Sequence, residues 1–327
     1  NNACCRRPAL PFAHAADFDN GGGTDGAVRM RKNSSQEGKE MKNYIKLMRP
    51  KHYIKNLILF LPIFFNGSIT NIQKLLSVIG GFCVFCLVSS VIYIINDTCD
   101  AENDRKHPTK CNRPIASGKI SKPSAIVFAV LLFACAMAIN WFVCKTNILA
   151  WVLTVGYIVL NLGYSLGLKN VVLADILILV SGYLIRLIYG SAITDIPVSN
   201  WLYLTVMAFS FYMGLGKRRG ELGGSGGTTR KVLKFYNRSF LDKNMYMTLG
   251  LGIVFYSLWC VDSGTVAMYS DKIIFTVPLV VIICMKYSLT LEGDSDGDPI
   301  SVIFHDKWLM ALALFYAALI LFIIYIF

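Results

Sequence analysis

Long apolar runs dominate this chain and limit the folds open to it. Nine runs predict membrane-spanning helices, at residues 54–70, 75–96, 124–144, 147–166, 171–193, 199–216, 245–262, 272–289 and 308–327. These lengths suit a helix that crosses the hydrocarbon, which takes about 20 apolar residues. Because lipid cannot satisfy open backbone polar groups, helices are the expected element. We therefore expect an all-α fold, a polytopic membrane protein with nine transmembrane helices.

The first forty residues differ from the rest of the chain. They are polar and rich in glycine, and they contain no sustained apolar stretch of the kind that a signal peptide carries. We interpret residues 1–40 as a disordered leader or a cloning remnant. Residues 41–327 are expected to form one transmembrane domain.

The basic residues are distributed unevenly, and this asymmetry predicts the topology. The formal net charge is +12, and lysine and arginine gather before the first run and in the segments 97–123 and 217–244. The alternate loops hold few basic residues. By the positive-inside rule, the N-terminal segment and the even-numbered loops face the cytoplasm.

Three carboxylates follow the second run directly, in the stretch NDTCDAENDRKHPTKCNRP (96–114). Asp97, Asp100 and Asp104 are spaced i, i+3 and i+7, so on a continued helix they share one face. Asn96 lies one turn before Asp100 and can reach the same place. Carboxylates on one face repel each other unless a cation joins them. Because oxygen ligands suit Mg²⁺, we predict that the three aspartates bind it.

Basic residues follow the carboxylates and complete a site for a diphosphate. Lys110 and Arg113 come within one short loop of Asp104. Together with a metal ion, such cations neutralise the charge that develops on a departing diphosphate. The alternative is a solvated loop with surface ion pairs, but the spacing on one helix face favours the site.

The stretch NDTCDAENDRKHPTKCNRPIASGKI resembles the first motif of the UbiA family of intramembrane transferases, N-D-x-x-D-x-x-x-D. The resemblance covers most of residues 41–327. It implies a bundle of nine helices, an active site that faces the cytoplasm, and Mg²⁺ bound to a diphosphate substrate.

The second half of the chain points to one branch of that family. UbiA prenyltransferases typically carry another aspartate-rich motif, but the matching region here offers Tyr164, Lys169 and Asp175, with no close pair of carboxylates. The stretches YSLGLK, SGYLIRLIYG and GKRRGEL resemble the polyprenyl-phosphate phosphoribosyltransferase branch. That resemblance implies transfer of 5-phosphoribosyl from phosphoribosyl diphosphate to a polyprenyl phosphate such as decaprenyl phosphate, with release of diphosphate. It also implies cell wall biosynthesis at a bacterial plasma membrane.

Further polar residues are candidates for binding the two phosphorylated substrates. Arg186 lies in the middle of a run, where an unpaired cation is expensive, and it is too far from Asp175 along the helix for a direct pair. Arginine binds phosphate bidentately, and lysine binds it as a point charge. The full set of candidate substrate-binding residues is Asn96, Lys55, Lys110, Arg113, Tyr164, Lys169, Asp175, Arg186, Lys217, Arg218 and Glu221.

The stretch LEGDSDGDP (291–299) has the composition of a calcium loop. It lacks the full twelve-residue pattern that ends in glutamate. We interpret it as a solvated turn before the last run and leave it out of the candidate site.

Two other functions stay open at this point. One is a UbiA prenyltransferase that moves a prenyl group from a prenyl diphosphate to an aromatic acceptor. The other is a non-enzymatic cation transporter, which would place its acids near the middle of the membrane rather than at its edge. The expected partners are phosphoribosyl diphosphate, a polyprenyl phosphate and membrane lipids. Nucleic acid is not expected as a partner, and assembly into a homo-oligomer is left open.

Overall fold

The computed structural model describes residues 38–223, 231–293 and 297–326. Within these ranges the chain forms helices and their connections, and no strand occurs there. The prediction of an all-α fold is therefore confirmed. The leader expected at residues 1–40 lies almost wholly outside the described residues.

Residues 38–48 are helical, and a long series of helices follows. In chain order these are η1 (Pro50–Phe60), α2 (Leu61–Phe65), α3 (Ile72–Cys99), α4 (Ala101–Lys106), η2 (Lys110–Asn112), α5 (Lys122–Cys144), α6 (Ile148–Leu166), η3 (Leu168–Asn170), α7 (Ala174–Thr194), α8 (Asn200–Gly223), η4 (Lys231–Phe235), α9 (Arg238–Val261), α10 (Ser263–Tyr269), η5 (Asp271–Thr276), α11 (Val277–Glu292), α12 (Pro299–His305) and α13 (Lys307–Ile326).

Seven helical segments of the described chain are long and apolar enough to cross a membrane. They are α3, α5, α6, α7, α9, the continuous segment Asp271–Glu292, and α13 up to Ile324. The runs expected at 54–70 and 199–216 are helical but are not among the seven, so the count of nine is not confirmed. The first of these forms η1, a 3-10 helix, which continues into the five residues of α2, with Pro62 near the start of α2. Proline lacks the amide hydrogen, and the first turn is the part of a helix that tolerates this loss.

The chain divides into two compact units, each with its own core. Among the described residues, the first unit comprises 38–50 together with Ser89–Ala134. Its buried apolar residues are Leu47, Val91, Ile94, Ala101, Ile115, Ile120, Ala125 and Ala129. This core packs the helix at 38–48 against the end of α3, the start of α4 and the start of α5, and it thereby fixes the α3–α4 corner.

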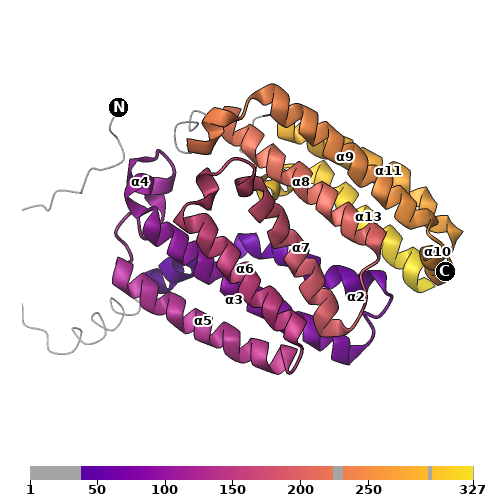
Figure 1. Ribbon diagram of the computed structural model, residues 1–327, viewed down its shortest axis with the longest axis horizontal. Helices are drawn as coiled ribbons and strands as arrows, with labels where there is room; N and C mark the ends of the chain where they lie inside the picture. Colours follow the sequence, from indigo (N-terminus) through magenta and orange to yellow (C-terminus); the bar gives the residue numbers. More distant parts are fainter. Residues whose placement is uncertain (1–37, 224–230, 294–296, 327) are drawn as a thin grey trace, which may run out of the picture. The chain divides into compact units, whose positions relative to one another are not determined.

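The second unit comprises Lys51–Val88 and Cys135–Phe327. In it, α8 packs against α7 and α9, α7 packs against α6, and α11 packs against α13 (Figure 1). The contact of η1 with α7 depends on a glycine, because a Cβ on Gly190 would lie 2.3 Å from the carbonyl oxygen of Leu59. This close approach sets η1, with its polar residues, against the helices of the unit.

Candidate functional site

Two of the predicted aspartates meet at the α3–α4 corner of the first unit. Asp97 lies in the last turn of α3 and Asp104 in α4, and Asp100 is the residue just before α4. Both Asp97 and Asp104 are buried, with 1% and 5% of their surface exposed. Arg113 binds the two together, since its Nη1 donates to Asp97 Oδ1 at 3.0 Å and to Asp104 Oδ2 at 2.6 Å. Two of the three carboxylates expected on one helix face thus lie together, and Arg113 is their shared cation.

Arg49 is a further member of this cluster. Its Nη2 lies 2.5 Å from Asp97 Oδ1, and its guanidinium lies over the ring of Tyr93, 5.1 Å from the centroid. In the sequence, Arg49 is one of several basic residues in the segment before the first apolar run, where basic residues predict topology. Nothing in the local sequence separates it from its basic neighbours, because its partner is 48 residues away.

The oxygen atoms at this corner suit a hard divalent cation. The Oδ1 atom of Asn96 is buried and has no hydrogen-bond partner in the described part of the chain, and a buried acceptor of this kind is costly unless something binds it. No group of three His, Cys, Asp or Glu side chains in the described residues is close enough to hold a metal ion. The structure therefore brings two of the three predicted aspartates together, with Asn96 beside them. The metal role of Asp97, Asp100 and Asp104 stays a prediction.

The loop after α4 presents Arg113 to the carboxylates. His107 Nδ1 accepts hydrogen bonds from the backbone amides of Thr109 and Lys110, at 3.3 and 3.4 Å. Burial and the nearby charge of Lys110 lower the pKa of His107, so the ring is suited to act as a neutral acceptor. Arg105 Nε donates to the carbonyl oxygen of Ala116 at 3.2 Å and fastens the far end of the loop.

A second cluster lies in the second unit and joins four of the predicted residues. Arg218 is completely buried and donates through Nε to Asp175 (2.5 Å), through Nη1 to Glu221 (2.7 Å) and through Nη2 to the Tyr164 hydroxyl (3.1 Å). Tyr236 donates to the other carboxylate oxygen of Asp175 at 2.7 Å. The sequence has no close pair of carboxylates near Asp175, yet Asp175 and Glu221 meet on one guanidinium. Their separation along the chain hid the pair.

A third cluster, also in the second unit, is basic. Lys55 Nζ lies 3.4 Å and Lys217 Nζ 3.7 Å from Asp298 Oδ1. Burial would raise the pKa of Asp298, but Lys55 and Lys217 outweigh it and lower the value below its ordinary range. Burial, and then the charge of Lys55, lowers the pKa of Lys217. The three groups carry a net charge of +1 when ionised.

Asp298 was missed because the turn before α12 was interpreted as solvated. That interpretation is wrong for Asp298, whose side chain is only 16% exposed; residues 294–296 of the same stretch lie outside the described residues. The backbone explains the burial. Gly297 has φ +74°, and a Cβ there would lie 2.6 Å from the carbonyl oxygen of Gly216, so glycine lets the turn press against α8.

Arg186 has neutral partners in the same unit. Its nitrogens donate to Asn56 Oδ1 at 2.6 Å, to the carbonyl oxygen of Gly182 at 2.7 Å and to the Tyr157 hydroxyl at 2.7 Å. The expectation that Arg186 does not pair with Asp175 agrees with these contacts. Arg186 thereby links η1, α6 and α7, and a contact with substrate stays a prediction for it. The same holds for Lys169, which is half-buried in η3.

Comparison with known proteins places the chain in a family. Residues 59–222 match the UbiA prenyltransferase family. The chain belongs to this family. It is 37% identical over 292 residues to the decaprenyl-phosphate phosphoribosyltransferase of Mycolicibacterium smegmatis. The matched region covers 83% of this chain and 88% of that protein. It is 33% identical over 289 residues to the protein of the same name from Corynebacterium glutamicum, with 86% of each chain covered.

Solved structures of UbiA proteins share the fold. A UbiA homologue from Archaeoglobus fulgidus, solved with GPP and Mg²⁺, superimposes with a TM-score of 0.65 at 16% identity, covering 85% of this chain and 99% of that one. A digeranylgeranylglyceryl phosphate synthase structure gives a TM-score of 0.57 at 19% identity, covering 86% and 98%. The predicted resemblance to the UbiA family and to its phosphoribosyltransferase branch is therefore confirmed, and with it an integral membrane fold.

Proposed function

We propose that this UbiA family member transfers the 5-phosphoribosyl group of phosphoribosyl diphosphate to a polyprenyl phosphate. The bond between the anomeric carbon and the diphosphate oxygen breaks, and a bond forms between that carbon and an oxygen of the acceptor phosphate. The products are polyprenyl-phosphoryl-phosphoribose and diphosphate.

The observation that carries the proposal is the similarity to the two decaprenyl-phosphate phosphoribosyltransferases over more than four-fifths of the chain. The aspartate corner supports the donor half of the reaction. Its oxygen groups are Asn96, Asp97 and Asp104, and its cations are Arg49 and Arg113. Such a mixture suits a diphosphate that arrives together with a divalent metal ion.

The residues of the corner have separate tasks in this proposal. Asp97, Asp104 and the Asn96 oxygen would bind Mg²⁺, with Asp100 beside them, and the metal ion neutralises diphosphate charge when bound. Arg113 and Arg49 turn from the aspartates toward the diphosphate oxygens, which both guanidinium groups can bind bidentately. The acceptor phosphate is already ionised, so its attack on the anomeric carbon needs no strong general base.

The position of the corner fits a donor that dissolves in water. It lies in the segment 97–123, whose basic residues favour the cytoplasmic side. Phosphoribosyl diphosphate would enter there, while the apolar helices accommodate a lipid. We therefore propose a cytoplasmic active site in the plasma membrane of a bacterium.

A direct assay tests this function. The purified full chain in lipid nanodiscs is incubated with Mg²⁺, phosphoribosyl diphosphate and a panel of polyprenyl phosphates, and the lipid products are identified by mass spectrometry. We expect a phosphoribosyl adduct and release of diphosphate. Transfer of a prenyl group from a prenyl diphosphate to an aromatic acid, with phosphoribosyl diphosphate untouched, would support the prenyltransferase alternative instead. Metal-ion flux into vesicles without diphosphate release would support transport.

A further inference from the structure

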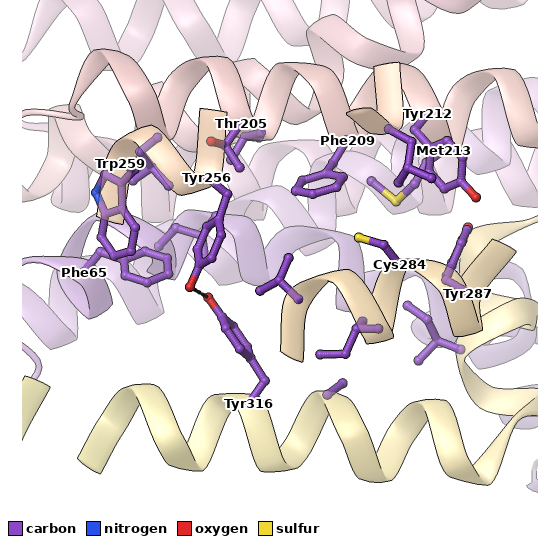
Figure 2. A pocket seen from close by; sticks show the side chains of 18 residues that line it. Phe65, Thr205, Phe209, Tyr212, Met213, Tyr256, Trp259, Cys284, Tyr287 and Tyr316 are labelled. Atoms are coloured by element: carbon purple, nitrogen blue, oxygen red, sulfur yellow. Dashed lines mark hydrogen bonds between the residues drawn. The ribbon is translucent and has the colours of Figure 1, made fainter. Parts of the chain in front are cut away.

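The second unit contains an apolar cavity of about 360 Å³ to which no role has been given. It is lined by apolar and aromatic residues of α2, α8, α9, α11, α12 and α13 (Figure 2). A pocket of this size with predominantly apolar walls is typical of a ligand site. The lining suits a hydrocarbon chain.

One stripe of α8 runs from the cavity to the basic cluster. Phe209 and Met213 line the cavity, and Lys217 is the next residue at the same i, i+4 spacing. Residues four apart lie on one face of an α-helix. Lys217 therefore lies on the same face of α8 as Phe209 and Met213, about one turn beyond the cavity lining.

Two other elements make the same connection. Lys55 in η1 lies six residues before Leu61, which lines the cavity, and in a 3-10 helix residues at this spacing share a face. On α11, Tyr287 lines the cavity and is close enough to Asp298 to interact with it electrostatically. Residues of three separate elements thus lead from the cavity to the cluster of Lys55, Lys217 and Asp298, and the side of the cavity near this cluster is its basic end.

The other end of the cavity has hydroxyl groups that are bonded to one another. Tyr316 donates to the Tyr256 hydroxyl at 3.1 Å, drawn as the dashed line in Figure 2, and Tyr256 lies 2.5 Å from the Thr276 hydroxyl. Thr276 donates in turn to the carbonyl oxygen of Ile273 at 2.6 Å. These groups satisfy each other, so this end does not require a polar ligand.

We propose that the cavity and the lysine cluster together form the acceptor site, which binds the phosphate of a polyprenyl phosphate at Lys55 and Lys217 and the first part of its hydrocarbon chain along α8. The net positive charge of the cluster attracts an anion, and the adjoining walls select one that carries an apolar chain. Asp298 positions the two amines. The inference rests on the proposed function for the identity of the acceptor.

The size of the cavity determines how binding affinity depends on the chain length of the polyprenyl phosphate. Its volume is near the lower end of the roughly 300–1,000 Å³ that drug-sized ligands occupy, and a long polyprenyl chain is larger than such a ligand. Only the isoprene units nearest the phosphate enter, and the rest stays in the lipid. Affinity rises with chain length until the cavity is full and then levels off.

The chain half of the site is tested by filling the cavity. Ala313 lines it and Ala318, on the same helix, does not. Ala313→Trp should raise the Kd for a long-chain polyprenyl phosphate at least tenfold, measured in nanodiscs, while Ala318→Trp leaves it within about twofold of the parent. Binding of phosphoribosyl diphosphate with Mg²⁺ should change in neither variant, which shows that both are folded.

The phosphate half is tested by removing the amines. Lys217→Met and Lys55→Met should each weaken polyprenyl phosphate binding at least tenfold and leave binding of the matching polyprenol unchanged. Lys231→Met is the matched control, because Lys231 is exposed in η4. If the two variants instead lose binding of phosphoribosyl diphosphate or inorganic phosphate and keep binding of the polyprenyl phosphate, the lysines bind the donor and the proposal is overturned.

The outcomes separate this site from the proposed function. Lipid binding with the expected variant pattern but no phosphoribosyl transfer would sustain the site and refute the reaction. Phosphoribosyl transfer with lipid affinities equal in Ala313→Trp and Ala318→Trp would sustain the reaction and refute the site.

Discussion

Arg218 Nε lies 2.5 Å from Asp175 Oδ2, and neither side chain is exposed. With Glu221 and Tyr164 also bound to the same guanidinium, Arg218 links the ends of α6, α7 and α8. A buried charge that loses its partner is strongly destabilising. We expect Arg218 to position the part of the second unit from which Lys217 projects, and a contact of Arg218 with substrate stays a prediction.

Loss of that buried pair should be measurable as lost stability. Arg218→Gln leaves Asp175 buried without its cation and should lower the free energy of unfolding by about 3–5 kcal/mol. Arg238→Gln is the control, since Arg238 is 70% exposed and lies 3.8 Å from Asp242, and exposed pairs contribute about 0–1 kcal/mol. Denaturant titration in detergent micelles compares the two. Equal losses would show that the Arg218 pair is not structural.

The aspartate corner should control turnover. Asp97→Asn and Asp104→Asn should each reduce turnover by a factor on the order of 100 or more, because the carboxylate charge helps to stabilise the departing diphosphate. Asp100→Asn tests the third predicted ligand in the same assay. Glu102→Gln, at an exposed position of α4, should retain parental activity. Near-parental rates in both Asp97→Asn and Asp104→Asn at saturating Mg²⁺ would remove the corner from the mechanism.

Metal dependence should reveal whether the Asn96 oxygen is a ligand. Chelation should stop turnover and added Mg²⁺ should restore it. Asn96→Leu should raise the Mg²⁺ concentration for half-maximal activity by roughly tenfold, without loss of stability, because it removes a buried acceptor that has no hydrogen-bond partner among the described residues. An unchanged Mg²⁺ requirement in Asn96→Leu would exclude that oxygen from metal binding.

Surface labelling checks the predicted sidedness. Ser117 and Thr146 are both exposed, in the loops that follow α4 and α5. In a background without native cysteines, we expect Ser117→Cys to react with an impermeant reagent only after the membrane is opened, and Thr146→Cys to react from outside. The reverse pattern would invert the topology and remove the cytoplasmic route for the donor.

Binding of the polyprenyl phosphate should begin to weaken at a pH below the pKa of an ordinary lysine. The pKa of Lys217 lies below 10.5, chiefly through burial and the charge of Lys55, although Asp298, Glu221 and Tyr164 act in the opposite direction. Since the protonated amine binds the lipid phosphate, affinity falls as pH rises through this lowered value. Lys217→Arg keeps its charge to higher pH, so its affinity should persist further into the alkaline range. Identical pH profiles for parent and Lys217→Arg would exclude Lys217 from phosphate binding.

The carboxylates of the first unit were predictable because their geometry is local. Asp97 and Asp104 are seven residues apart, about two helical turns, and Arg113 follows sixteen residues after Asp97. Helical spacing predicts that Asp97 and Asp104 are neighbours, and the short chain distance brings Arg113 within reach of both. Arg49 was not predictable in this way, because its contact with Asp97 depends on how the helix at 38–48 packs on α3.

The sequence by itself determined an all-helical membrane protein of the UbiA family, since apolar run length and motif spacing are properties of consecutive residues. Only the tertiary structure decided how charges far apart in the sequence are paired. It brings Asp175 to Arg218 across 43 positions of the chain, and Asp298 to Lys55 across 243 positions. The physical reason is that long-range ion pairs follow from which helices pack together. That choice is made by the summed fit of many apolar side chains, and no single stretch of sequence encodes it.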